Sequence, residues 1–93
     1  MEKKPIEIEG TTLPFVTYEK DATRYYFFDA TQSSPPEPMI NALRALEYIK
    51  KGEILIGLFF HAPEPLFAKI EPFFEYKVTP LTSGDVEVEF RRK

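Results

Sequence analysis

Cysteine is absent from this chain of 93 residues. The sequence therefore has no disulfide, no thiolate nucleophile and no thiolate ligand for a metal ion, which fits a reducing compartment.

Long apolar segments are also missing. The longest, residues 54–60, is far shorter than the roughly 20 residues that a membrane-spanning helix needs. No apolar region follows Met1 to Pro5, so we expect no signal peptide. We expect a soluble, cytoplasmic protein that binds no membrane and carries no cofactor.

An excess of positive charge is absent as well, since the net charge is −3 at pH 7. Proteins that bind nucleic acids usually present a concentrated basic surface. The basic cluster Arg91-Arg92-Lys93 is interpreted as a solvated tail, and no nucleic-acid partner is predicted. Side-chain amides are confined to Gln32 and Asn41. Beside abundant glutamate and lysine, this scarcity is typical of a thermophilic source.

Alternating apolar and polar residues predict strands in both halves of the chain. Residues 6–9 alternate before Gly10, and residues 15–19 and 24–30 predict a hairpin. A last hairpin is predicted for residues 76–81 and 86–92 around a Thr-Ser-Gly-Asp turn. We divide the single compact domain into an N-terminal strand extension, residues 1–23, and a main part, residues 24–93.

One long helix is predicted after the strand at residues 24–30. Ser34 is a good N-cap, Pro35 suits the first helical position, and Glu37 completes a capping box. An apolar stripe follows at spacings of three and four, formed by Met39, Ala42, Leu43, Leu46 and Ile49. Lys50 and Lys51 are expected in the last turn, and Gly52 is expected to end the helix.

A buried strand, residues 53–60, follows this helix and predicts a βαβ unit with parallel strands. The loop His61 to Pro65 then leads to a short helix from Leu66 to Glu71. The order from residue 24 is β-α-β-α-β-β. The predicted fold is therefore α/β, an α+β two-layer sandwich. A mixed sheet carries two helices on one face and an added N-terminal strand pair.

The start of the long helix resembles the Cys-Pro-x-Pro signature of the TusA/SirA-like sulfur-carrier family. The matching residues are Pro36-Glu37-Pro38-Met39, preceded by Asp29-Ala30-Thr31 and followed by Lys51-Gly52-Glu53. Within that superfamily the chain is most similar to a cysteine-less branch of unknown function with Pro-Pro-Glu here and a later Pro-x-Pro-Leu. The later element reads Pro63-Glu64-Pro65-Leu66.

The resemblance implies the same fold, and it implies that Pro36 and Pro38 stiffen the helix start. Pro35 occupies the position of the persulfide-bearing cysteine, so persulfide transfer is excluded. Ser34 and Glu37 are expected to satisfy the helix's first N–H groups, which would neutralise the helix end that activates a thiol in the carriers.

Three functions stay open. The first is a non-catalytic interaction or regulatory module that binds a protein partner or a second copy. We expect its working surface to contain Asp29, Ser34, Pro35, Pro36, Glu37, Pro38, His61 and Glu64. The second is a small enzyme or a metal- or ligand-binding domain. It would be centred on His61, a weak metal candidate, with Asp29, Glu37 or Glu64 as oxygen ligands. A serine hydrolase using Ser33 or Ser34 with His61 and Asp29 lacks an oxyanion-hole motif.

The third function, a structural homodimerisation domain, follows from the aromatic content of nine phenylalanines and five tyrosines. Tyr25 to Phe28 is aromatic at every position, and Leu55 and Phe59 alternate with the other apolar residues of their strand. Apolar side chains are therefore predicted on both faces of the sheet. The N-terminal strands could curl over the second face, a second copy could pack there, or a partner could dock.

Overall fold

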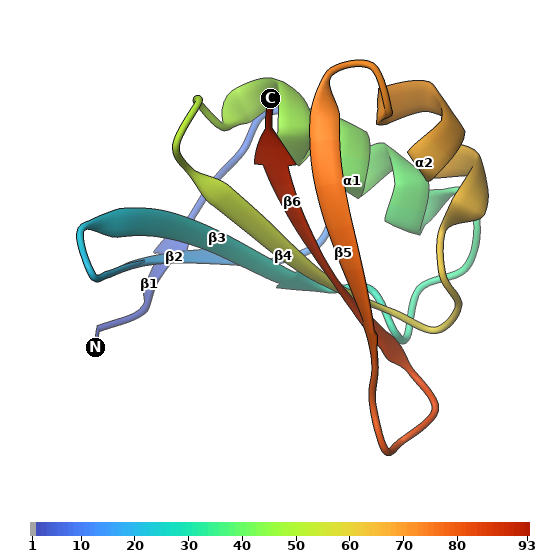
Figure 1. The fold of residues 1–93 in the computed structure, drawn as a ribbon. Helices are drawn as coiled ribbons and strands as arrows, with labels where there is room; N and C mark the ends of the chain where they lie inside the picture. Colours follow the sequence, from blue (N-terminus) through green and yellow to red (C-terminus); the bar gives the residue numbers. More distant parts are fainter. Residues whose placement is uncertain (1) are drawn as a thin grey trace.

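Within residues 2–93, which the computed structural model describes, six strands form one mixed sheet and two helices lie together on one face of it (Figure 1). The elements are β1 (Lys4–Ile6), β2 (Phe15–Lys20), β3 (Thr23–Asp29), α1 (Glu37–Tyr48), β4 (Ile54–Phe59), α2 (Glu64–Ile70), β5 (Phe74–Pro80) and β6 (Val86–Arg92). The predicted α+β sandwich is confirmed. Within residues 2–93, no helix has the length and apolarity needed to cross a membrane.

The strand order is β1-β2-β3-β4-β6-β5. Among the strands of the described chain, only β3 and β4 pair in parallel, as expected for strands joined through a helix; the other neighbouring pairs are antiparallel. The predicted N-terminal extension, residues 1–23, contributes β1, β2 and the first residue of β3, and Met1 lies outside the described residues. Because β1 and β2 continue the sheet beyond β3, they do not curl over its second face. That explanation for the apolar residues there is wrong.

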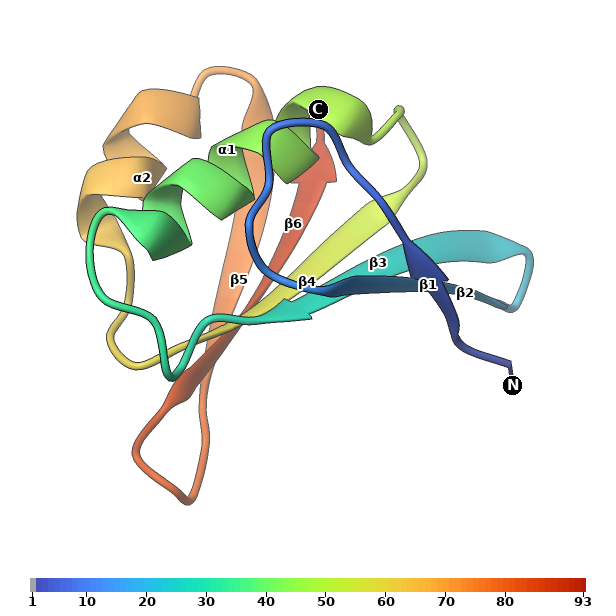
Figure 2. The ribbon, with the colours of Figure 1, turned by 180° about the vertical axis from the view of Figure 1, so that it is seen from behind.

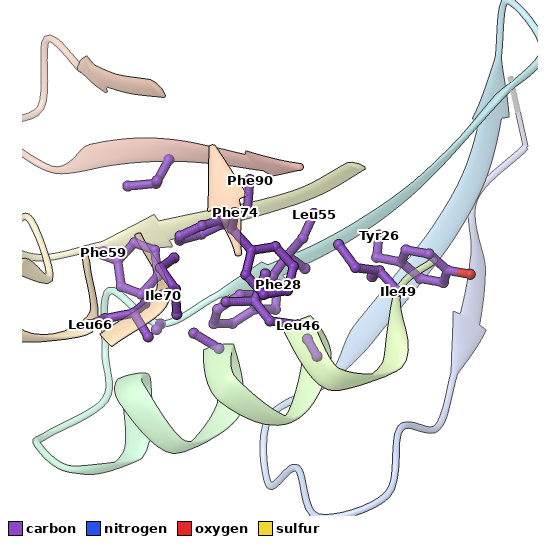
Figure 3. Close-up of a cluster of buried hydrophobic side chains, with 14 of the residues drawn as sticks. Tyr26, Phe28, Leu46, Ile49, Leu55, Phe59, Leu66, Ile70, Phe74 and Phe90 are labelled. Carbon is purple, nitrogen blue, oxygen red and sulfur yellow. The ribbon is translucent and has the colours of Figure 1, made fainter. Parts of the chain in front are cut away.

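The core lies between the sheet and the helices and is dominated by phenylalanine (Figure 3). The rings of Phe28 and Phe59 meet edge to face at 5.6 Å, and those of Phe59 and Phe90 at 6.5 Å. All three side chains are almost completely buried. Burying one such side chain stabilises the fold by about 1.5–3 kcal/mol. The helix stripe contributes Ala42, Leu46 and Ile49, as predicted.

The predicted capping box is wrong. Helix α1 begins only at Glu37, its N-cap is Pro36, and no side chain of residues 2–93 caps it. The backbone N–H of Glu37 is instead bonded to the carbonyl of Ser34 at 3.0 Å. The two predicted capping residues are engaged in other ways: the Ser34 carbonyl closes this turn, and the Glu37 carboxylate accepts from the hydroxyl of Thr12 at 2.6 Å instead of reaching back to Ser34.

The C-terminal end of α1 also differs from prediction. The helix ends at Tyr48, so Lys50 and Lys51 lie beyond its last turn. Arg92 takes the expected role of a cation at this end, because its guanidinium donates to the carbonyls of Leu46 at 2.8 Å and Ile49 at 3.0 Å. A residue 43 positions away in the sequence from Ile49 thus completes the helix.

The segment between β1 and β2 crosses the outside of α1 instead of continuing the sheet (Figure 2). Strand β1 ends at Ile6, earlier than predicted, because Ile8 leaves the sheet to pack in the core. The segment is held by Asn41, the only polar residue in the buried core of the described chain. Asn41 Oδ1 accepts from the backbone N–H groups of Thr12 at 2.8 Å and Leu13 at 3.0 Å.

Candidate functional site

The two loops predicted to form the working surface leave the same edge of the sheet. Strands β3 and β4 are parallel, and the N–H of Ala30 extends their pairing by donating to the carbonyl of Leu58 at 2.8 Å. Residues 30–36 then lead from β3 into α1, and residues 60–63 lead from β4 into α2. Ligands of α/β sheets commonly bind beyond the carboxyl ends of parallel strands, so this corner is a candidate binding site.

Both helices begin with the same three residues, Pro-Glu-Pro. In Pro36-Glu37-Pro38 and in Pro63-Glu64-Pro65 the first proline is the N-cap and the glutamate is the first helical residue. The second proline loses nothing there, because N–H groups in the first turn have no partner within the helix. Helix α2 therefore starts at Glu64, two residues earlier than predicted.

A pocket of about 310 Å³ lies between these two helix starts. Its wall is mostly apolar and contains five of the nine prolines of the chain. The lining residues are Ala30, Ser33, Pro35, Pro36, Pro38, Met39, Phe59, Phe60, His61, Ala62, Pro63 and Pro65. A proline ring has a fixed φ angle and loses almost no side-chain entropy on burial, so the wall is largely preorganised for binding.

Phe60 and His61 form the rim that β4 contributes. The Phe60 side chain is 61% exposed, which is unusual for a phenylalanine, and its ring lies 4.3 Å from the imidazole of His61 at an angle of 59°. His61 is exposed as well. His61 and Ser33 are the two polar side chains of the lining.

Four of the predicted site residues lie at this corner without lining the pocket: Asp29, Ser34, Glu37 and Glu64. The carboxylate of Asp29 accepts from the N–H of Thr31 at 2.9 Å and from its hydroxyl at 2.6 Å, which fixes the turn after β3. The carboxylate of Glu37 accepts from the hydroxyl of Thr12 at 2.6 Å. Ser34 and Glu64 are exposed.

This arrangement does not assemble the metal or hydrolase centre that the sequence left open. Among residues 2–93, no three of the residue types His, Cys, Asp and Glu gather closely enough to hold a metal ion. Ser33 and His61 share the pocket, but Asp29, the residue considered for orienting the imidazole, is bonded to Thr31. Within the same residues, no hydrogen bond joins His61 to Ser33, Ser34 or Asp29.

The charge of the corner is acidic. Residues 29–38 and 59–66 contain three acidic residues, Asp29, Glu37 and Glu64, and no lysine or arginine. An apolar pocket with carboxylates around it can bury an apolar group and attract a cation beside it.

Sequence reasoning missed Met39, Phe59 and Phe60 as pocket residues. Met39 was assigned to the core stripe and Phe60 to the buried strand. The repeated Pro-Glu-Pro was the available signal, because it marks two similar helix starts at one end of a parallel strand pair.

A larger hollow, about 750 Å³, lies along residues 5–15. One continuous stretch of chain lines it, so it is the open inside of the segment between β1 and β2 and brings no distant residues together. The pocket between the helix starts is the stronger candidate for this reason.

Comparisons of the chain with protein-family models, with curated proteins and with solved structures found no match.

Proposed function

We propose that this protein is a non-catalytic interaction module, and that its proline-lined pocket takes an apolar side chain of a protein partner. The observation that carries the proposal is the pocket itself, a rigid apolar hollow at the carboxyl ends of two parallel strands. The resemblance to TusA/SirA-like carriers supports it, because the corner keeps the paired prolines and has Pro35 in place of the reactive cysteine.

The size of the pocket fits a single large side chain. Ligand pockets commonly have volumes of about 300–1,000 Å³, and this one, at about 310 Å³, lies at the lower end. An aromatic ring can stack on Phe60 and on the flat proline rings, while Met39 adapts to its edge. Burying one such ring contributes about 1.5–3 kcal/mol, which is less than the roughly 4.1 kcal/mol that a Kd of 1 mM requires. The ring alone therefore gives only a weak, reversible interaction.

The charges indicate what should stand beside that ring. Asp29, Glu37 and Glu64 surround the corner without a nearby lysine or arginine in the two segments that form it. The best partner segment is therefore an aromatic residue flanked by lysine or arginine. The cytoplasmic location and the thermophilic source remain predictions of the sequence.

The test is a titration of the protein with Ac-Gly-Lys-Phe-Lys-Gly-NH₂, followed by ¹⁵N-resolved NMR. We expect saturable shifts at the pocket, and we expect Phe60→Ala to weaken binding roughly tenfold. Phe73→Ala is the matched control, because Phe73 is 63% exposed but lies away from the pocket. Equal weakening by both variants, or no saturable binding, contradicts the proposal.

Two further peptides separate the ring from the charges. Replacing the phenylalanine by alanine should abolish binding. Replacing both lysines by glutamate should weaken it at low ionic strength and matter little at 1 M salt, where the Debye length falls to about 3 Å.

The alternative, a metal or small-ligand domain centred on His61, is favoured by one observation: the imidazole stands on the pocket rim. His61→Ala should abolish binding of a metal such as Zn²⁺ under this alternative. Under the interaction proposal the same variant keeps most of its affinity for the peptide.

The relation to sulfur carriers can be examined with Pro35→Cys. If this variant accepts sulfur from a cysteine desulfurase, the docking surface of the carriers is present at this corner. An inert thiol argues against that relation.

A further inference from the structure

The sheet face opposite the helices carries a continuous apolar block. Strand alternation and register place seven side chains on it, from three neighbouring strands. They are Val16 and Tyr18 of β2, Tyr25 and Phe27 of β3, and Ile54, Ile56 and Leu58 of β4. Neither described helix covers this face (Figures 1 and 2). A solvated face of a sheet normally alternates to polar residues, so the block needs a covering surface.

The block is ordered by its own packing. The rings of Tyr18 and Tyr25 stack at 5.1 Å with an angle of 5° between their planes. Val16 lies opposite Phe27, and Phe27 lies beside Ile56. Six of the seven side chains are half-buried, and Ile54 is buried. The block is therefore a preformed apolar surface on the twisted sheet (Figure 1).

The two flanks of the block differ in charge. On the β2 side, Lys20 ends the strand and the ammonium group of Lys3 lies 5.6 Å from the centre of the Tyr18 ring. On the other side β6 places Glu87 and Glu89 next to the block. Glu89 is paired with Arg91 at 2.8 Å, whereas Glu87 forms no ion pair within the described chain.

The strand beyond β6 does not reverse this difference. On this face β5 adds Glu75 and Lys77, which lie opposite Arg91 and Glu89 in the register. Their charges cancel, and Glu87 remains as the excess negative charge of this flank. Burial raises the pKa of Tyr18, and Tyr25, Glu87 and Glu89 raise this pKa further.

We propose that two copies of this chain pair through this face, with the β2 flank of each copy over the β6 flank of the other. A two-fold axis can superpose like flanks or opposite flanks. Superposing like flanks brings Lys3 and Lys20 of both copies together. Superposing opposite flanks places the lysines of each copy against the acidic flank of the other, so the same favourable contact forms on both sides of the interface. In this arrangement the two apolar blocks face each other.

The charge pattern suits a second copy of the same chain, because the acidic flank of one copy complements the lysine flank of the other. Sheets that pack face to face in this way keep their strands within about 30° of each other. This pairing leaves the proline-lined pocket free, so it stands or falls independently of the proposed function.

Sedimentation equilibrium from 10 µM to 1 mM tests the pairing. We expect a dimer that Phe27→Glu converts to a monomer, while the equally drastic Phe60→Glu at the pocket leaves it dimeric. A wild-type chain that is monomeric at 1 mM overturns the proposal, and the apolar face would then be a binding surface for a different protein. Circular dichroism of each variant shows whether its fold is retained.

Charge reversal tests the orientation without touching the apolar block. Lys3→Glu with Lys20→Glu should weaken the dimer roughly tenfold at low salt, and so should Glu87→Lys. A mixture of these two variants should form a heterodimer of wild-type strength, because both contacts again join opposite charges. If the mixture is as weak as each variant alone, the flanks do not face each other and the orientation is wrong.

Discussion

Asn41 is the most informative single position for stability, because it joins the N-terminal segment to α1. Its side chain makes four hydrogen bonds: the two described above to the N–H groups of Thr12 and Leu13, and two donated at 2.9 Å to Thr12 Oγ1 and the carbonyl of Glu37. The side chain is completely buried, and every one of its polar atoms is used.

Asn41→Ala removes all four bonds. At about 1 kcal/mol net for each, with some recovery as the backbone of the exposed Thr12 rehydrates, the loss is about 3 kcal/mol. A domain of this size has a total stability of about 5–14 kcal/mol. A loss of this size lowers the melting temperature by roughly 12–24 °C.

The assay is urea unfolding followed by circular dichroism, combined with amide exchange at Thr12 and Leu13. Both amides should be protected in the wild type and should exchange fast in Asn41→Ala. Asn41→Asp keeps the shape but points a carboxylate at the carbonyl of Glu37, so it should cost at least as much. A loss below 1 kcal/mol with both amides still protected would refute the reasoning.

Three further predictions concern the buried sheet face and its surroundings. Burial, reinforced by the nearby Glu53, raises the pKa of Tyr26 to about 12. Neutral Tyr26 therefore stabilises the fold fully below pH 10, and this stabilisation is lost as the pH rises through 12. Tyr26→Phe should flatten this decline in alkaline unfolding curves, and the last tyrosinate signal at 295 nm should disappear. Arg92→Ala should cost about 2 kcal/mol in urea unfolding, because it uncaps α1. Arg91→Ala is the matched control, and an equal loss for both contradicts the capping role. Gly57→Ala would place a methyl group 2.8 Å from two buried phenylalanine rings and should cost about 1–3 kcal/mol; an unchanged unfolding midpoint would show that the rings yield freely.

Strand and helix order could be predicted from the sequence because local periodicity determines it. The apolar stripe of α1 and the alternation in β6 each need only their own residues. The helix ends could not be predicted, because they depend on distant partners. Arg92 caps α1 from the last strand, and Thr12 occupies the carboxylate of Glu37 that was assigned to a cap.

The candidate corner was predicted as a region, and its chemistry was only partly predicted. His61 and the prolines were expected to meet because β3 and β4 are parallel. The exposure of Phe60 was not expected, since it continues an apolar run. The position of β1 and β2 was also undecided, because local alternation gives strands but not their neighbours in the sheet.

The most direct test of binding at this corner is an intermolecular NOE measurement on the complex with Ac-Gly-Lys-Phe-Lys-Gly-NH₂. We predict cross-peaks from the peptide's phenyl protons to the methyl groups of Met39 and Ala62, which lie within the pocket wall. Cross-peaks to Val16 or Ile56 on the open sheet face, without any to Met39 or Ala62, would contradict a binding role for the proline-lined pocket.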